Sequence, residues 1–258
     1  MQTVAIITPT VGSVHLRACV ASVCGQTSSR PTRVIHVLVA DGPEAAGKVR
    51  DVVESVPSGQ TERMFMALSW NTGSGGWNGH KIYAAVPHLL PQDVSYVMFL
   101  DEDNTLDADH VSTLTASLAG APPGSWAFAL RKIMSPRGET ICLDVCESLG
   151  SLHHTVLHEN DYLVDVNCYC LPLSLAQRTS WCWQRRARDP TGEVDRILCR
   201  ELLPLPHRCS GVFSVNYRVG DARQDSVQAE FFVRGNQTLW SSRPPANETS
   251  DDGPAGPR

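Results

Sequence analysis

The N-terminal part of the chain alternates between short apolar runs and segments with helical periodicity, and this alternation constrains the fold more than any other feature. Residues 4–10, 34–40 and 96–100 are mostly apolar, with many β-branched or aromatic side chains. Such runs are typical of strands that are buried on both faces of a parallel sheet. Apolar residues then recur at spacings of three and four from Leu16 to Val23, the pattern of an amphipathic helix. This alternation predicts a parallel, twisted α/β sheet.

The same patterns predict the elements of the whole chain. In the first half, strands are expected at residues 4–10, 34–40, 64–68 and 96–100, and helices at 15–23, 45–56 and 81–90. Beyond Leu118 the alternation breaks, and we expect strands at 126–134, 140–145, 162–171 and 212–219 with a helix at 191–203. These elements predict one mostly parallel α/β domain over residues 1–240, with a mixed α+β half from 121 and a disordered, proline-rich tail at 241–258.

Composition excludes several classes of protein. The 258-residue chain has 22 Lys and Arg against 27 Asp and Glu, a net charge of -5, so it has no basic excess for a nucleic-acid partner. No run of apolar residues is long enough for a membrane span, and the N-terminus lacks the basic start of a signal peptide. We therefore expect a cytoplasmic protein. The nine cysteines show no C-x-x-C spacing, and most are expected to be buried thiols.

Polar motifs follow three of the predicted strands at the point where each strand ends. They are Thr8-Pro9-Thr10, Asp41-Gly42 and Asp101-Glu102-Asp103. Because ligands of open parallel sheets gather at the carboxyl ends of the strands, these motifs are expected to meet in one cleft.

Asp101 and Asp103 lie two residues apart directly after an apolar run. In extended geometry they point the same way, and two carboxylates so close need a cation between them. Mn²⁺ or Mg²⁺ binds one or two carboxylates together with phosphate oxygens, so a diphosphate substrate is indicated. The alternative for this motif alone is a helix cap or a solvated turn.

Taken in order, the Thr-Pro-Thr and Asp-Gly strand ends, a glycine-rich loop at 71–81 and Phe-Leu-Asp-Glu-Asp at 99–103 resemble the nucleotide-sugar half of GT-A glycosyltransferases, most closely their family 2. The resemblance covers about residues 2–120. It implies a GT-A-like, Rossmann-type nucleotide-binding sheet flanked by helices, followed by an acceptor half. It also implies metal-dependent, inverting transfer of a sugar from a nucleoside diphosphate sugar, with uridine as the expected base, to an acceptor hydroxyl.

The resemblance further implies roles for individual residues. The first two strand ends would hold the base and ribose, His80 or Lys81 would meet the phosphates, and Asp103 would bind the metal. The substrate-binding residues that it implies are Thr8, Pro9, Thr10, Asp41, Trp77, Asn78, His80, Lys81, Asp101, Glu102 and Asp103. For Trp77, a packing role at the base of the loop is the alternative.

The second half would supply a catalytic base and a further metal ligand. Asp195, near the start of the helix expected at 191–203, is the best-placed acid for the base, and His207 would complete the metal shell. A carboxylate that only stabilises a helix N-terminus is the alternative for Asp195. Two other functions remain open: a catalytically inactive nucleotide-sugar-binding domain and a sugar nucleotidyltransferase. The residues do not identify the acceptor.

Overall fold

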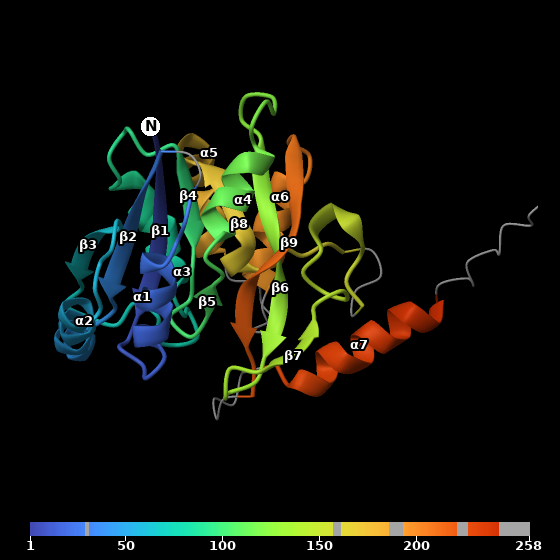
Figure 1. Ribbon diagram of the computed structural model, residues 1–258, viewed down its shortest axis with the longest axis horizontal. Coiled ribbons are helices and arrows are strands. Elements are labelled where there is room, and N and C mark those ends of the chain that lie inside the picture. Colours follow the sequence, from blue (N-terminus) through green and yellow to red (C-terminus); the bar gives the residue numbers. More distant parts are fainter. Residues whose placement is uncertain (29–30, 157–160, 186–192, 221–226, 243–258) are drawn as a thin grey trace, which may run out of the picture.

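The computed structural model describes residues 1–28, 31–156, 161–185, 193–220 and 227–242 (Figure 1). Within these ranges nine strands form one sheet, in the order β3, β2, β1, β4, β8, β6, β9 and β5, with β7 paired to β6. The strands are β1 (Gln2–Thr10), β2 (Thr32–Ala40), β3 (Glu62–Ala67), β4 (Tyr96–Phe99), β5 (Thr105–Leu106), β6 (Trp126–Met134), β7 (Thr140–Leu143), β8 (Tyr169–Pro172) and β9 (His207–Arg218).

Helices cover this sheet. They are α1 (Leu16–Cys24), α2 (Pro43–Ser55), α3 (His80–Ala85), α4 (His110–Ser117), α5 (Leu173–Arg178), α6 (Glu193–Leu202) and α7 (Ala229–Ser242). The short 3₁₀ helices are η1 (Val86–His88), η2 (Gly150–Leu152), η3 (Val166–Cys168) and η4 (Ser180–Gln184). None of the described helices is long and apolar enough to cross a membrane.

The first half has the expected parallel arrangement, because β1 pairs in parallel with β2 and β4, and β2 with β3. Successive side chains of a strand point to opposite faces. Leu38 and Ala40 of β2 accordingly pack in one cluster with residues of α1 and α2, whereas Val37 and Val39 belong to the larger cluster that includes α3. The buried apolar runs thus have helices on both faces, as the sequence pattern predicts.

The second half is mixed. Strand β8 runs antiparallel to both β4 and β6, and β9 runs parallel to β6. Consequently β4, β6 and β9 all point the same way as β1 and β2. In Figure 1 the arrowheads of β6 and β9 point to the lower edge of the sheet. The carboxyl ends of strands from both halves therefore lie on one edge.

Several elements differ from the prediction. The strand expected at 162–171 is mostly a loop with the turn η3, and only Tyr169–Pro172 is a strand. The reason is that the carboxylate of Asp165 accepts a hydrogen bond from the backbone N–H of Asn167 and begins the turn. The helices α4, α5 and α7 are additional. Of the tail expected to be disordered, residues 241 and 242 lie in α7, and the rest lies outside the described residues.

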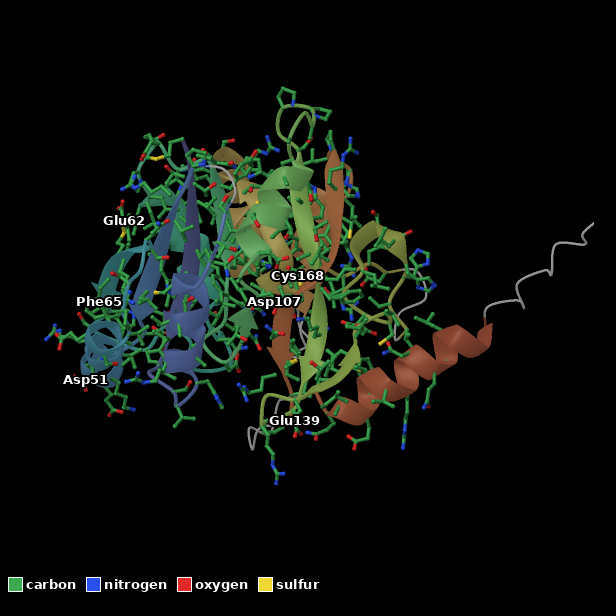
Figure 2. The ribbon with its side chains drawn as sticks, viewed as in Figure 1. Asp51, Glu62, Phe65, Asp107, Glu139 and Cys168 are labelled. Atoms are coloured by element: carbon green, nitrogen blue, oxygen red, sulfur yellow. The ribbon has the colours of Figure 1, made fainter. Side chains whose placement is uncertain are left out.

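The cysteines behave largely as expected. All nine are free thiols, and six of them are buried. Cys168, which is fully buried, lies among the strands near the centre of the molecule (Figure 2). The six buried cysteines therefore serve as small core residues, and none of the nine forms a disulfide.

Candidate active site

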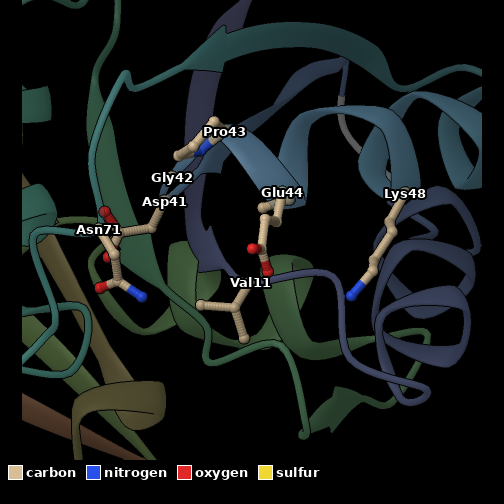
Figure 3. Close-up of a pocket in the computed structure, with 8 residues that line it drawn as sticks. Val11, Asp41, Gly42, Pro43, Glu44, Lys48 and Asn71 are labelled. Atoms are coloured by element: carbon tan, nitrogen blue, oxygen red, sulfur yellow. The ribbon is translucent and has the colours of Figure 1, made fainter.

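A pocket of about 310 Å³ opens at the carboxyl ends of β1 and β2, beside the N-terminus of α2 (Figure 3). Its lining consists of Val11, Asp41, Gly42, Pro43, Glu44, Ala45, Lys48 and Asn71. Figure 3 shows Glu44 and Lys48 extending from α2 on one side and Asn71 lying on the other. The pocket offers both hydrogen-bond donors and acceptors to a ligand, at the sheet edge where the sequence predicts a site.

Asp41 lies at this pocket and holds the glycine-rich loop. Its two carboxylate oxygens accept hydrogen bonds from the backbone N–H groups of Thr72 and Gly73, at 2.7 and 2.9 Å. A Cβ atom on Gly73 would clash with the carbonyl oxygen of Asn78, so only glycine fits there. Asn78 itself has a φ of +47°, the left-handed conformation that asparagine tolerates. The loop is therefore closed on itself and anchored to the end of β2.

The end of the same loop packs on β1. A Cβ atom on Gly79 would lie 2.5 Å from Cγ of Pro9, so the missing side chain allows the close approach. His80 begins α3 and stacks on Trp183 of η4, with ring centroids 5.9 Å apart. Burial lowers the pKa of His80 to about 4, so its imidazole is neutral at pH 7. His80 therefore packs on Trp183 without a positive charge, and its contact with phosphates stays a prediction.

Lys81 is the cation that this loop presents. Its side chain is exposed, and Nζ lies 4.7 Å from the centroid of the Trp77 ring. A cation over the face of an aromatic ring is attracted by the ring electrons. Of the two candidates for meeting phosphates, Lys81 is the one that presents a positive charge to solvent.

Thr8, Thr10 and Glu102 hold the loop that follows β1. The hydroxyl of Thr8 is fully buried and bonds Nε2 of His36 at 3.0 Å. The hydroxyl of Thr10 donates to Glu102 Oε2 at 2.6 Å, and the backbone N–H of Ser13 donates to the same oxygen at 2.9 Å. All three side chains bond inside the protein, and their contact with substrate stays a prediction.

Asp101 is fixed through both carboxylate oxygens. The hydroxyl of Tyr83 donates to Oδ1 at 2.7 Å, and Nδ2 of Asn167 donates to Oδ2 at 3.1 Å. Burial raises the pKa of Asp101 to about 7, with the negative charges of Asp103 and Asp165 adding to the rise. The acidic motif after β4 therefore lies in a region where negative charge is concentrated.

Helix α6 brings Asp195 into this region. Its Oδ1 atom is buried and has no hydrogen-bond partner among the described residues. Burial raises the pKa of Asp195 well above its usual range, and the carboxylates of Asp165 and Asp101 add to it, while Arg131 and Arg196 oppose it. The predicted base and the acidic motif, 94 residues apart along the chain, therefore belong to one electrostatic cluster.

Arg131 supports the cluster from β6 and was not predicted from the sequence. It is buried, forms an ion pair with Asp144 at 2.7 Å and a second, shorter one with Asp165, and lies over the ring of Tyr217. A buried guanidinium needs such partners to offset its desolvation. In the sequence, a charged residue within the apolar run 126–134 could have indicated that Arg131 has buried acidic partners. For Asn167, the signal was an amide inside the apolar run 162–171.

His207 lies far from the acidic motif, so its prediction as a metal ligand with Asp103 is corrected. It begins β9, whereas Arg218, at the other end of that strand, donates from Nε to the backbone oxygen of Asp103 at 3.3 Å. A strand of that length spans roughly 35 Å. The ring of His207 instead bonds Ser151 at 2.8 Å and stacks on Trp126.

The remaining residues fit a divalent cation only together with a substrate. Among the described residues, no group of three or more His, Cys, Asp or Glu side chains forms a metal site by itself. Asp103 nevertheless raises the pKa of Asp101, so the two carboxylates lie close enough to repel each other. A cation that binds one or two carboxylates and takes its other ligands from phosphate oxygens fits this arrangement.

Comparison with known proteins supports the fold and does not assign a family. Neither a scan against protein-family models nor a search of curated proteins finds a match. Solved structures do match. Residues 1–349 of S. aureus TarS give a TM-score of 0.57 at 13% identity, covering 84% of this chain and 60% of that one.

Two ligand complexes of the same protein match as well. The complex with UDP-GlcNAc gives a TM-score of 0.57 at 13% identity, covering 93% of this chain and 65% of that one. The complex with UDP gives 0.54 at 10% identity, covering 85% and 61%. This chain thus spans less than two thirds of the length of these TarS structures. At such identities the likeness concerns the fold alone, and the chain has a GT-A-like α/β fold.

Proposed function

We propose that this chain transfers a sugar from a uridine diphosphate sugar to an acceptor hydroxyl, with inversion at the anomeric carbon. The observation that carries the proposal is the buried, unpartnered Oδ1 atom of Asp195, which lies near enough to Asp165 and Asp101 for their negative charges to act on it. The presence of UDP-GlcNAc and UDP in the matching TarS structures supports a uridine nucleotide as donor.

The donor would bind along the edge from the pocket to the acidic motif. The pocket at Asp41 and Asn71 has donors and acceptors for a base and a ribose, and Lys81 supplies an exposed positive charge for the diphosphate. Asp101 would accept hydrogen bonds from the ribose or the sugar. Asp103 would hold Mn²⁺ or Mg²⁺, which when bound supplies positive charge to the leaving diphosphate.

Asp195 would act as the general base. Its Oδ1 takes the proton of the acceptor hydroxyl as that oxygen forms a bond to the anomeric carbon, and the bond from this carbon to the diphosphate oxygen breaks. Attack from the face opposite the diphosphate inverts the configuration. A carboxylate whose pKa lies above its usual range, as burial causes here, is a stronger base than a solvated one.

The test combines binding with product analysis. Isothermal titration with UDP-, GDP- and CDP-sugars in the presence of Mn²⁺ is expected to show the tightest binding for a UDP-sugar. Incubation with a panel of hydroxyl acceptors is expected to release UDP and to give a product of inverted configuration by nuclear magnetic resonance. Release of pyrophosphate would instead indicate a nucleotidyltransferase, and binding without turnover an inactive binding domain. Absence of binding to any nucleotide sugar would refute the proposal.

A further inference from the structure

Asn167 makes an unusual number of contacts for one side chain. It is fully buried in η3. Its Oδ1 accepts a hydrogen bond from the backbone N–H of Asp101 at 2.7 Å. Its Nδ2 donates to Asp101 Oδ2 at 3.1 Å and to Asp165 Oδ1 at 2.7 Å. Both ends of the amide are therefore engaged, and two of its three contacts are with one residue of the acidic motif.

Only an amide satisfies these neighbours. A carboxylamide carries an acceptor oxygen and two N–H donors, which here face one backbone N–H and two carboxylates. A carboxylate at 167 would keep the acceptor but would place a third negative charge between Asp101 and Asp165. An apolar side chain would leave the backbone N–H of Asp101 without its partner, which is costly for a buried group.

The amide is itself held by a chain of buried charges. Asp165, which accepts from Asn167, pairs with Arg131, and Arg131 pairs with Asp144. These groups come from β6 and from the loops around β7 and β8. The carboxylate at the end of β4 is thus oriented by elements of the second half of the chain.

We propose that Asn167 is a positioning residue that fixes the carboxylate of Asp101 in the orientation that binds the nucleotide donor. The proposal rests on the proposed function, because it assigns Asp101 to the donor. Tyr83 completes the arrangement from the other side, since its hydroxyl donates to Oδ1. With Asn167 in place neither oxygen of Asp101 can turn away. Hydrogen bonds from Tyr83 and Asn167 also oppose the rise in the pKa of Asp101 that burial causes.

The first experiment measures UDP affinity by isothermal titration in the presence of Mn²⁺. Asn167→Ala is expected to weaken UDP binding about tenfold, the scale of one hydrogen bond to a charged group. Asn216→Ala is the matched control, because Nδ2 of Asn216 donates to Asp107 at 2.9 Å without contacting Asp101. The control should bind UDP as the unmodified protein does. Equal affinities of all three proteins would overturn the proposal.

A double-mutant cycle separates positioning from a general effect on folding. If Asn167 acts through Asp101, then Asn167→Ala should change UDP affinity by less than about twofold when Asp101 is already alanine. A merely structural role of Asn167 would instead weaken binding equally in both backgrounds, which would contradict the proposal.

Asn167→Asp covers the case in which the alanine variant does not fold. It keeps the shape of the side chain and removes both N–H donors, so we expect UDP binding at least about tenfold weaker. Unchanged UDP binding in this folded variant would overturn the proposal and leave the proposed function intact. If the unmodified protein binds neither UDP nor any UDP-sugar, the proposed function fails, and this inference fails with it.

Discussion

Asp195 places a carboxyl group where its ionisation is unfavourable. Burial and the nearby negative charges of Asp165 and Asp101 hold its pKa well above the usual range, and its Oδ1 atom has no partner in the described part of the chain. A buried polar atom without a partner destabilises the folded state. Such a group is expected where a ligand supplies the missing contact, and an acceptor hydroxyl can donate to this oxygen.

The first prediction concerns the chemistry of this residue. Asp195→Asn removes the base and keeps the size of the side chain, so transfer should fall by roughly 10²-fold or more, while the affinity for UDP should change little. Initial rates and isothermal titration measure the two effects. Asp93→Asn is the control, because Asp93 is an exposed partner of Arg33. Near-normal transfer by the Asp195 variant, or a product of retained configuration, would contradict the assignment.

The second prediction concerns stability and pH. The pKa of Asp195 is higher in the folded chain than its value of 3.8 in the unfolded chain. Its contribution to stability is therefore full below pH 3.8 and is lost as the pH rises through the folded pKa. An amide at this position has no such loss, so the Asp195→Asn protein should become the more stable of the two as the pH rises. We expect a gain of at least about 1 kcal/mol at pH 8, roughly 2–4 °C in Tm.

Thermal melts of both proteins from pH 4 to pH 8 test this. The difference in Tm should be small at pH 4 and widen steadily toward pH 8. A difference that is constant across this range, or that favours the unmodified protein at high pH, would mean that Asp195 ionises without penalty in the folded state.

The glycine-rich loop between β3 and α3 is the element on which the donor site most depends. Asp41 holds its start, and its end lies against β1 because Gly79 has no Cβ atom to meet Pro9. The third prediction is that Gly79→Ala lowers the free energy of unfolding by about 1–3 kcal/mol, the usual cost of overpacking. Because the loop must move away from β1, UDP affinity should also fall. Melting curves and isothermal titration measure the two changes.

Gly47→Ala is the control for this substitution. Gly47 lies in α2 with open space where a Cβ atom would be, so alanine there should raise stability by roughly 0.5–1 kcal/mol. UDP affinity should stay the same. If Gly79→Ala were as stable as Gly47→Ala and bound UDP equally well, the close packing of the loop on β1 would be unimportant for the site.

At the level of elements, the sequence predicts strands best where burial is uniform. Strands β1, β2 and β6 lie close to their expected ranges because most of their side chains are buried on both faces. The strand expected at 162–171 is wrong because Asp165 caps the turn η3. The buried side chains of Asp165 and Asn167 are held there by partners distant in sequence, Arg131 and Asp101. Local periodicity does not reveal such partners. The polar strand ends could likewise be predicted, but not the directions of their side chains.

The whole sheet explains why residues from both halves meet. Strand β8 reverses direction between β4 and β6, so β6 and β9 end on the same edge as β4. Arg218 at the end of β9 accordingly contacts the acidic motif, through the backbone oxygen of Asp103 and the side-chain oxygen of Asn104. The same geometry puts His207, at the start of β9, on the opposite edge. Its place could not be predicted before the start and direction of β9 were known.

The last prediction concerns the charge of this shared edge. The negative charges of Asp103 and Asp165 already act on Asp101, so a diphosphate brought beside this motif needs a cation. UDP should therefore raise the Tm in the presence of Mn²⁺ or Mg²⁺. At a UDP concentration 100 times its Kd, the free energy of unfolding should rise by about 2.7 kcal/mol. With EDTA the shift should disappear. Equal shifts in Mn²⁺ and in EDTA would remove the metal from the mechanism.

Two variants locate the cation within the acidic motif. Asp103→Ala should abolish the metal dependence, because Asp103 is the carboxylate assigned to the ion. Asp107→Ala should leave it intact, because Asp107 lies beyond β5, pairs with Lys132 at 2.6 Å and accepts from Asn216 at 2.9 Å. Melting curves with UDP and increasing Mn²⁺ compare the two variants. If the Asp107 variant lost the metal-dependent shift and the Asp103 variant kept it, the cation would lie on the β5 side of the motif, and the assignment of Asp103 would be wrong.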